Sequence, residues 1–264
     1  MASLELFQYY FSVVVAQWSW ILIDSVVTVG LSWALTMAQP AKTLAPSRPT
    51  ARLLGPETLW SAGGQIALNF AFLSGGFGIL YRQSWFRCRE FDASAVDTAR
   101  WWLLGDSYEA EVIAIICLFQ FINAAATFNF GHRYRRAWWR NWTLVLYWAS
   151  LMTLVSWMCL ADPNRVGCFF RLNCGTASVL TNELGYPQPN WSISSYNSPL
   201  GHNVMPTSFR WLLWAWCMLN AILAILWERM VIVGPVRQWI IRHKAKDEAE
   251  EEMVRLEGKE GKML

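Results

Sequence analysis

Long apolar runs separated by polar links dominate the hydrophobic pattern of this 264-residue chain. A helix needs roughly 20 apolar residues to cross the hydrocarbon core of a bilayer. We therefore predict an all-α membrane protein with about five transmembrane helices. The five runs of sufficient length cover residues 7–37, 59–81, 112–130, 142–161 and 209–233.

Basic residues are distributed unequally among the polar segments, which predicts the orientation of the chain. The links at 38–58 and 131–141 and the C-terminal tail are rich in Lys and Arg, whereas residues 1–6 have none and 162–208 only two. The loop at 82–111 has four Arg, which weakens the contrast. Because short basic segments remain in the cytosol, we expect a lumenal N-terminus and a cytosolic C-terminus. The predicted parts are a lumenal segment (1–6), a membrane domain (7–233) with a long lumenal loop (162–208), and a charged cytosolic tail (234–264).

Composition supports a membrane protein and excludes several other classes. Hydrophobic residues make up 55% of the chain and charged residues 16%, against about 25% charged in typical soluble domains. A net charge of +3, with no separate basic and aromatic stripe, gives no reason to expect a nucleic-acid partner; membrane lipids are the expected surroundings. The sequence lacks nucleotide-binding, serine-hydrolase and zinc-protease motifs. It also lacks a CxxC pair with zinc-ligand spacing, so we expect no metal site.

The loop at 162–208 contains two candidate modification sites. Cys168 and Cys174 lie six residues apart, so a disulfide would form if the loop faces an oxidising lumen. Asn190 begins an Asn-Trp-Ser acceptor for glycosylation, which is usable only on the lumenal side. Asn141 begins a similar tripeptide in a basic link, where we expect it to remain unmodified.

Polar residues inside the apolar runs are candidates for function or for helix packing. Asp24 is the one carboxylate in the middle of a run, where a charge costs at least about 2.5–3.5 kcal/mol. It either meets a cationic substrate or a proton, or tethers helices as a hydrogen-bonded carboxyl. For Gln65, Asn69, Gln120 and Asn123 we favour ordinary hydrogen bonds between helices. Small residues spaced by four predict a face of close helix packing; they are Ala67, Ala71 and Gly75.

The basic link at 131–141 carries a spaced motif, G-x-x-[FY]-R-R-x-x-x-x-N. It resembles the link between the eighth and ninth membrane helices of the fifth class of P-type ATPases, in the subgroup that exports polyamines. Further matches occur in the same order as in the family, and the resemblance covers about Gln17 to Arg242. The matching residues are Gly131, Tyr134, Arg135, Arg136 and Asn141 in the link, and Gln17–Asp24, Pro40, Leu44, Arg48–Leu53, Gly64–Gln65, Gln83–Phe86, Tyr108–Glu109 and Phe119–Gln120 elsewhere.

The resemblance implies roles for three residues and makes the five spans helices six to ten of such a pump. Asp24 matches the carboxylate of the sixth helix that meets the cationic substrate. Trp20 stands at an aromatic position from which it could contact an amine through a cation–π interaction. Gln8 resembles a substrate-facing glutamine of the fifth helix, although its distance from Asp24 is shorter than in the family.

The function implied is the C-terminal membrane portion of a polyamine-type P-type ATPase, either a truncated product or an incomplete gene model. ATP and Mg²⁺ serve the full-length family, but the phosphorylated Asp and the nucleotide-binding domain have no counterpart here, so we expect no ATPase activity and no cofactor on this chain alone. The expected partners are a cationic substrate and the remaining segments of such a pump, in an endosomal, lysosomal or vacuolar membrane. Two alternatives are a stand-alone membrane scaffold or regulatory protein, and an unrelated small transporter or channel.

Overall fold

The protein forms a bundle of long helices. The computed structural model describes residues 2–11, 13–42, 55–86, 105–129, 135–193, 196, 200–236, 238–240 and 242, and within these ranges it is all-helical without strands. Five helices are long and apolar enough to cross a membrane, which confirms the predicted fold class and the number of spans; they are Gln17–Thr36, Pro56–Tyr81, Tyr108–Thr127, Trp142–Leu160 and Thr207–Ile240.

The first and last of these spans each combine α-helical and π-helical segments. The first consists of α2 (Gln17–Ile21), η1 (Leu22–Val29) and α3 (Gly30–Thr36), and the last of α9 (Thr207–Leu226) and η4 (Trp227–Val236). The other three spans are single α-helices: α4 (Pro56–Tyr81), α5 (Tyr108–Thr127) and α6 (Trp142–Leu160). The short helices are α1 (Ala2–Phe11), η3 (Trp138–Arg140), α7 (Arg165–Phe169) and α8 (Ala177–Asn182).

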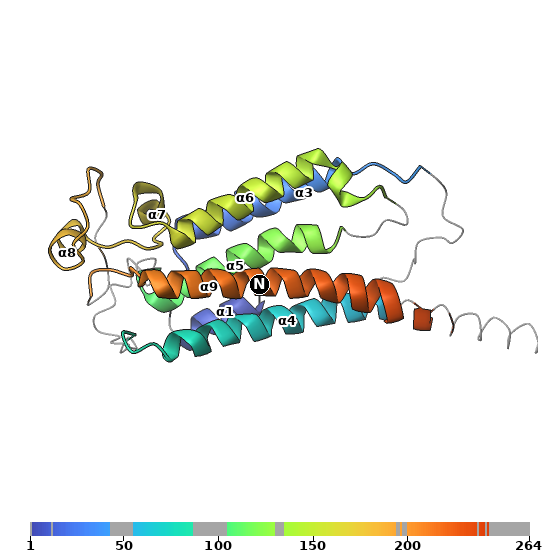
Figure 1. Ribbon diagram of the computed structural model, residues 1–264, viewed down its shortest axis with the longest axis horizontal. Helices are drawn as coiled ribbons and strands as arrows, with labels where there is room; N and C mark the ends of the chain where they lie inside the picture. The colour runs from blue at the N-terminus through green and yellow to red at the C-terminus, as the bar shows by residue number, and fades with distance from the viewer. Residues whose placement is uncertain are drawn as a thin grey trace, which may run out of the picture.

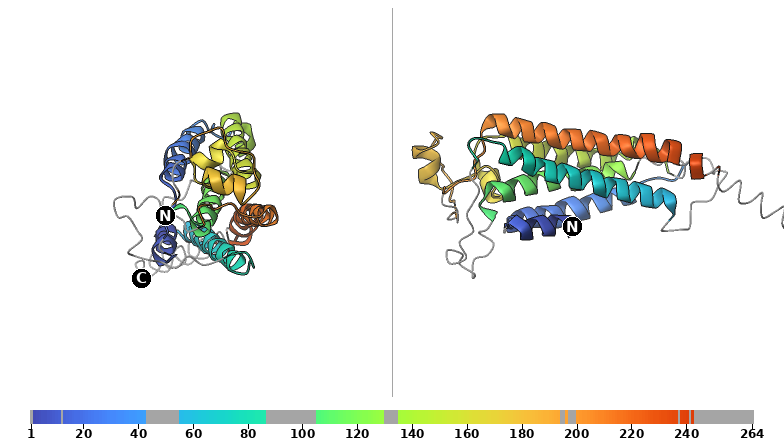
Figure 2. Two further views of the ribbon diagram at one scale, coloured as in Figure 1. Left: turned by 90° about the vertical axis from the view of Figure 1, so that its left-hand side faces the viewer. Right: turned by 90° about the horizontal axis from the view of Figure 1, so that it is seen from below.

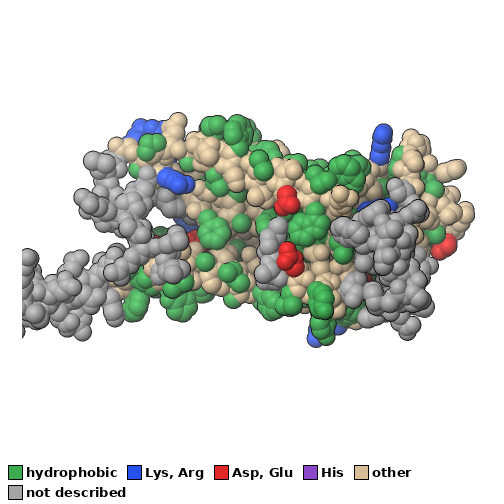
Figure 3. All heavy atoms as spheres, turned by 180° about the vertical axis from the view of Figure 1, so that it is seen from behind, with side chains coloured by type: hydrophobic (Ala, Val, Ile, Leu, Met, Phe, Trp, Pro, Cys, Tyr) green, Lys and Arg blue, Asp and Glu red, His purple; other side chains and the backbone are tan. Residues whose placement is uncertain are grey.

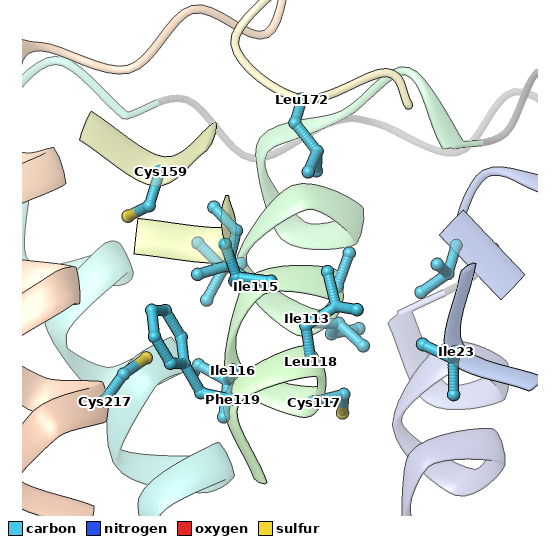
Figure 4. Packing of buried hydrophobic residues seen from close by; sticks show 14 of the residues in the cluster. Ile23, Ile113, Ile115, Ile116, Cys117, Leu118, Phe119, Cys159, Leu172 and Cys217 are labelled. Atoms are coloured by element: carbon cyan, nitrogen blue, oxygen red, sulfur yellow. The ribbon is translucent and has the colours of Figure 1, made fainter. Parts of the chain in front are cut away.

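Helix α5 is the centre of the bundle. In its most apolar stretch 83% of the residues are buried inside the protein, against 28–33% in the other four spans. The other spans surround it in the end-on view of Figure 2 and run alongside it in Figure 1. The isoleucines of α5 and Phe119 lie between Cys217 on one side and Ile23 on the other (Figure 4). A helix that is apolar all round, as α5 is, favours this central place.

The first apolar run differs from the single helix predicted over 7–37. The chain forms α1, reverses direction, and enters the membrane-length span only at Gln17. The Val13 amide closes α1 by donating to the Gln8 carbonyl at 3.0 Å. Residues 2–6 belong to α1, and Leu4 is buried in the core. The run exceeds the length that one span requires, and the excess folds back along the bundle.

Of the three small residues predicted to pack closely on α4, Gly75 does so, whereas the two alanines do not. Ala67 and Ala71 are exposed. The close approaches occur at Gly64, beside the Trp227 indole, and at Gly75, where an added Cβ would lie 2.5 Å from the Trp216 ring. The face of α4 that packs against the last span is set by the positions of these two tryptophans. The spacing of small residues within α4 cannot predict those positions.

The two ends of the bundle differ in character. One end carries the cap, residues 162–206, which includes α7, α8 and the Cys168–Cys174 disulfide. The described residues of the two basic links, including Lys42 and Arg135, lie at the opposite end (Figure 1). Several residues considered above lie outside the described ranges: Leu44, Arg48–Leu53, Gly131, Tyr134 and the tail from residue 243.

Candidate functional site

Asp24 lies on the exposed surface of the first span, within the π-helical segment η1. It forms no hydrogen bond or ion pair with any described residue. The described part of the chain therefore contains no partner for the predicted helix tether. Figure 3 shows acidic side chains midway along one long face of the bundle, with hydrophobic side chains around them.

The π-helical geometry of η1 changes the hydrogen bonding of the backbone around Asp24. The Thr28 hydroxyl donates to the Ile23 carbonyl at 2.8 Å, and the Tyr147 hydroxyl of α6 donates to the Val26 carbonyl at 2.7 Å. Gly30 follows directly, and the Tyr147 ring occupies the space that a side chain would need there. Single-turn π segments inside α-helices are frequent at functional sites. Tyr147 and Gly30 thus fix the irregular segment that carries Asp24.

A row of polar side chains continues from Asp24 along the same helix. Asp24, Thr28, Ser32 and Thr36 follow each other at intervals of four residues, and all four are exposed. Residues four apart lie on one helix face. The Thr36 hydroxyl donates to the Trp33 carbonyl at 2.7 Å, within its own helix. We call this row the polar stripe; it runs from the middle of the span toward the basic end.

The other two predicted substrate residues occupy different surroundings. Trp20 lies one helical turn before Asp24, half-buried against the apolar core. Gln8 lies on α1, and its buried Nε2 atom has no hydrogen-bond partner among the described residues. Within the described chain no hydrogen bond joins Gln8 to Trp20 or Asp24. The fold places Trp20 and Asp24 on successive turns, but it does not join Gln8 to them.

The remaining polar residues within spans form bonds between helices, as we favoured. The Gln65 amide of α4 donates to the Ala224 carbonyl at 2.8 Å, and the Gln120 amide of α5 donates to the Asn69 carbonyl at 3.0 Å. Asn123 donates to the Ala221 carbonyl at 3.2 Å. These amides join α4, α5 and α9.

A buried polar network under the cap was not predicted from the sequence. The Asn173 amide donates to Glu111 Oε1 at 2.7 Å, although Glu111 lies near the start of the apolar helix α5. Ser107 caps this helix by accepting from the Ala110 amide, so α5 begins at Tyr108 rather than at the predicted Val112. The approach of Arg171 to Asp106 at 3.4 Å adds an ion pair.

Arg210 extends this network to α6. Its side chain is 1% exposed, and its guanidinium donates to the carbonyls of Leu160 and Ala161 and, at 2.8 Å, to Asp162 Oδ1. Carbonyls at the end of a helix lack partners within the helix. Arg210 satisfies those of α6, so its role here is to join two spans at the cap. A charged residue at the second position of the apolar run 209–233 was the available signal for this role.

Two stretches of the cap place titratable side chains in partly buried positions. Burial lowers the pKa of His202, and the Glu183 carboxylate opposes that shift. The His202 Nδ1 atom accepts from the Val204 amide at 3.2 Å. Burial also raises the pKa of Tyr196, whose ring lies 4.6 Å from the Arg171 guanidinium carbon. These groups support the conformation of the cap.

Metal chemistry has no evident place in the described ranges, where no three His, Cys, Asp or Glu side chains gather as metal ligands do. The residues with the chemistry of a ligand site are instead the carboxylate of Asp24, the hydroxyls beyond it and the Trp20 ring before it. No protein-family model matches this chain, and no curated protein matches it.

Proposed function

We propose that this chain is the C-terminal membrane portion of a P-type ATPase of the polyamine-exporting subgroup. In this proposal Asp24 meets a cationic amine within the bilayer, and sequence outside this chain supplies the domains that use ATP and Mg²⁺. The motifs that follow each other from Gln17 to Asn141 support it. So does the presence of five membrane-length helices.

The exposed polar stripe is the observation that carries the proposal. A carboxylate facing hydrocarbon is unfavourable by at least about 2.5–3.5 kcal/mol, so such a group faces a water-filled path or further protein. From Asp24 to Thr36 the stripe extends over roughly 18 Å at 1.5 Å per residue. A carboxylate, hydroxyl acceptors and the aromatic ring of Trp20 match the needs of an alkylammonium ion.

The proposal includes an orientation and a location. The basic end is cytosolic, because Lys and Arg in short links stay on that side. The disulfide cap then faces the lumen, whose redox conditions maintain disulfides. The membrane is that of a late endosome, lysosome or vacuole. Supporting the orientation, the described basic links and the disulfide lie at opposite ends of the bundle.

Cysteine labelling of the stripe in membranes tests this function. The experiment uses a Cys88→Ser background. The free cysteines of the described chain, Cys117, Cys159 and Cys217, are buried. We expect a cationic methanethiosulfonate reagent to modify Thr28→Cys, and spermine to slow that modification several-fold. Adding Asp24→Asn should abolish the protection by spermine, because the carboxylate that attracts the amine is lost.

The matched control is Ile66→Cys, an exposed position on the apolar surface of α4. It should remain unmodified, since the charged reagent does not enter hydrocarbon. Equal reactivity at both positions, or spermine protection that survives Asp24→Asn, would contradict the proposal. A membrane scaffold without a cation path predicts no effect of spermine. In either case the purified chain alone should show no orthovanadate-sensitive ATPase activity.

A further inference from the structure

A basic hollow of about 410 Å³ lies between the two links at the end of the bundle opposite the cap. Its lining includes four cationic side chains together with the indole of Trp139; the cations are Lys42, Arg135, Arg136 and Arg140. Among the described residues, the lining contains no Asp or Glu. This volume is within the usual range for small-molecule sites.

Backbone and side-chain bonds hold the two links together around this hollow. Pro40 and Arg135 form an isolated antiparallel bridge, and the Arg136 amide donates to the Gln39 carbonyl at 3.0 Å. The Arg136 guanidinium also donates to Gln39 Oε1. These bonds bring Lys42 beside arginines that are distant in sequence. The hollow is therefore a tertiary feature, and not only a run of charges in one link.

The positive charge of the hollow has no counterion among the described residues. None of its four cations forms an ion pair with a described residue. The Nε atom of Arg136 is enclosed and has no acceptor among the described residues. Like charges held this close repel one another, so a bound anion relieves an unfavourable arrangement. Arg also presents a planar set of donors that suits phosphate oxygens.

The position of the hollow suits a ligand at the membrane surface. Trp139 borders the hollow, and Trp142, which begins α6, is 70% exposed. Tryptophan favours the headgroup layer of a bilayer. The first turn of α6 adds a partial positive charge, since the amides at a helix start lack partners. Asn141 caps this turn and donates to the Ala34 carbonyl at 2.8 Å.

We propose that this hollow binds a ligand bearing several phosphate groups, with the arginines pairing to phosphate oxygens. Two sources share this chemistry: the headgroup of a phosphorylated inositol lipid and a soluble inositol phosphate. The site is independent of Asp24 and of the proposed pump function, because it rests on other residues at one end of the bundle.

Titration of the purified full chain in detergent tests the site and separates the two sources. One arm uses short-chain phosphatidylinositol 4,5-bisphosphate, a second uses inositol 1,4,5-trisphosphate, and phosphatidylcholine of equal chain length is the blank. Binding of the lipid alone identifies the headgroup as the ligand. Equal binding of the trisphosphate identifies the soluble phosphate. Binding of neither ligand above the blank overturns the proposal.

Substitutions then locate the binding. Arg140→Gln should raise the dissociation constant of the ligand about tenfold, because one charge-assisted pair with a phosphate oxygen is lost. Arg140 is exposed, so the fold should remain intact, and an unchanged thermal transition would show this. The matched control is Arg165→Gln, an exposed arginine on α7 of the cap. If Arg165→Gln weakens ligand binding as much as Arg140→Gln does, the phosphates are attracted nonspecifically by the positive charge of the protein, and the proposed site is refuted.

Discussion

The backbone amide of Asn173 in the cap donates to the buried carboxylate of Glu111 in the central helix α5 at 2.7 Å. The Asn173 side chain extends this connection, since its amide donates to the Cys159 carbonyl at 3.2 Å and its Oδ1 accepts from the Met205 amide at 3.1 Å. One asparagine thus links the cap to two spans and to the chain that enters the last span. Buried polar groups of this kind are costly when a partner is removed.

We expect Asn173→Ala to destabilise the protein by about 2–4 kcal/mol, because buried partners of the amide lose their bonds. The backbone adds to the effect: Asn173 has a φ of 48°, a region that Asn tolerates better than Ala. The measurement is thermal unfolding in detergent. Asn182→Ala, at an exposed position at the end of α8, should change stability by less than about 0.5 kcal/mol. Equal losses in both variants would refute this role of Asn173.

Two glycines of α4 provide a matched test of helix packing. An added Cβ at Gly75 would lie 2.5 Å from the Trp216 ring, whose indole is fixed by a 2.9 Å hydrogen bond to the Phe72 carbonyl. Gly75→Ala should therefore destabilise by about 1–3 kcal/mol through overpacking.

Gly78→Ala is the control, because nothing lies within 4 Å of its added Cβ. It should stabilise α4 by up to about 1 kcal/mol, the difference in helix propensity between Ala and Gly. Unfolding by heat or denaturant compares the two variants. The packing of α4 against α9 would need revision if Gly75→Ala were the more stable of the two.

Stability of the cap should fall in acid because of His202. Burial lowers its pKa below the ordinary value of 6.5, so the folded cap favours the neutral imidazole. The unfolded form takes up a proton first as the pH falls, and the His202 contribution to stability is present above pH 6.5 and lost below it. Melting temperatures at pH 7.5 and 5.5 measure this effect. His202→Asn should reduce the difference between the two pH values, and an unchanged difference would assign it to other groups.

Asn190 should carry a glycan when the chain is made in eukaryotic cells, if the cap is lumenal. The residue is exposed in the cap, and Asn141, in the other acceptor tripeptide, caps α6 and is half-buried. Endoglycosidase treatment should shift the gel mobility of the natural chain but not of Asn190→Gln. A shift that persists in Asn190→Gln would indicate modification elsewhere and count against the proposed orientation.

Some features of the fold follow from local sequence alone. The number and approximate limits of the spans depend on the length of each apolar run, and a helix satisfies its own backbone groups wherever such a run enters hydrocarbon. Cys168 and Cys174 are six residues apart, so a disulfide between them could be proposed from the sequence alone. The sequence shows that Asp24 lies within an apolar run, but it does not predict that the side chain is exposed.

The tertiary structure decided which faces meet. Sequence spacing selected Ala67, Ala71 and Gly75 for close packing. Trp216 does project onto Gly75, but the second close approach is that of Trp227 to Gly64. Burial of Glu111 and Arg210 likewise depends on a cap that folds over the end of α5. The positive charge of the link from 131 to 141 can be read from its sequence. The proximity of Lys42 to the arginines of that link depends on the tertiary bonds made by Gln39 and Pro40. Helix formation is a local property of a run, and contacts between runs depend on the shape of the partner surface.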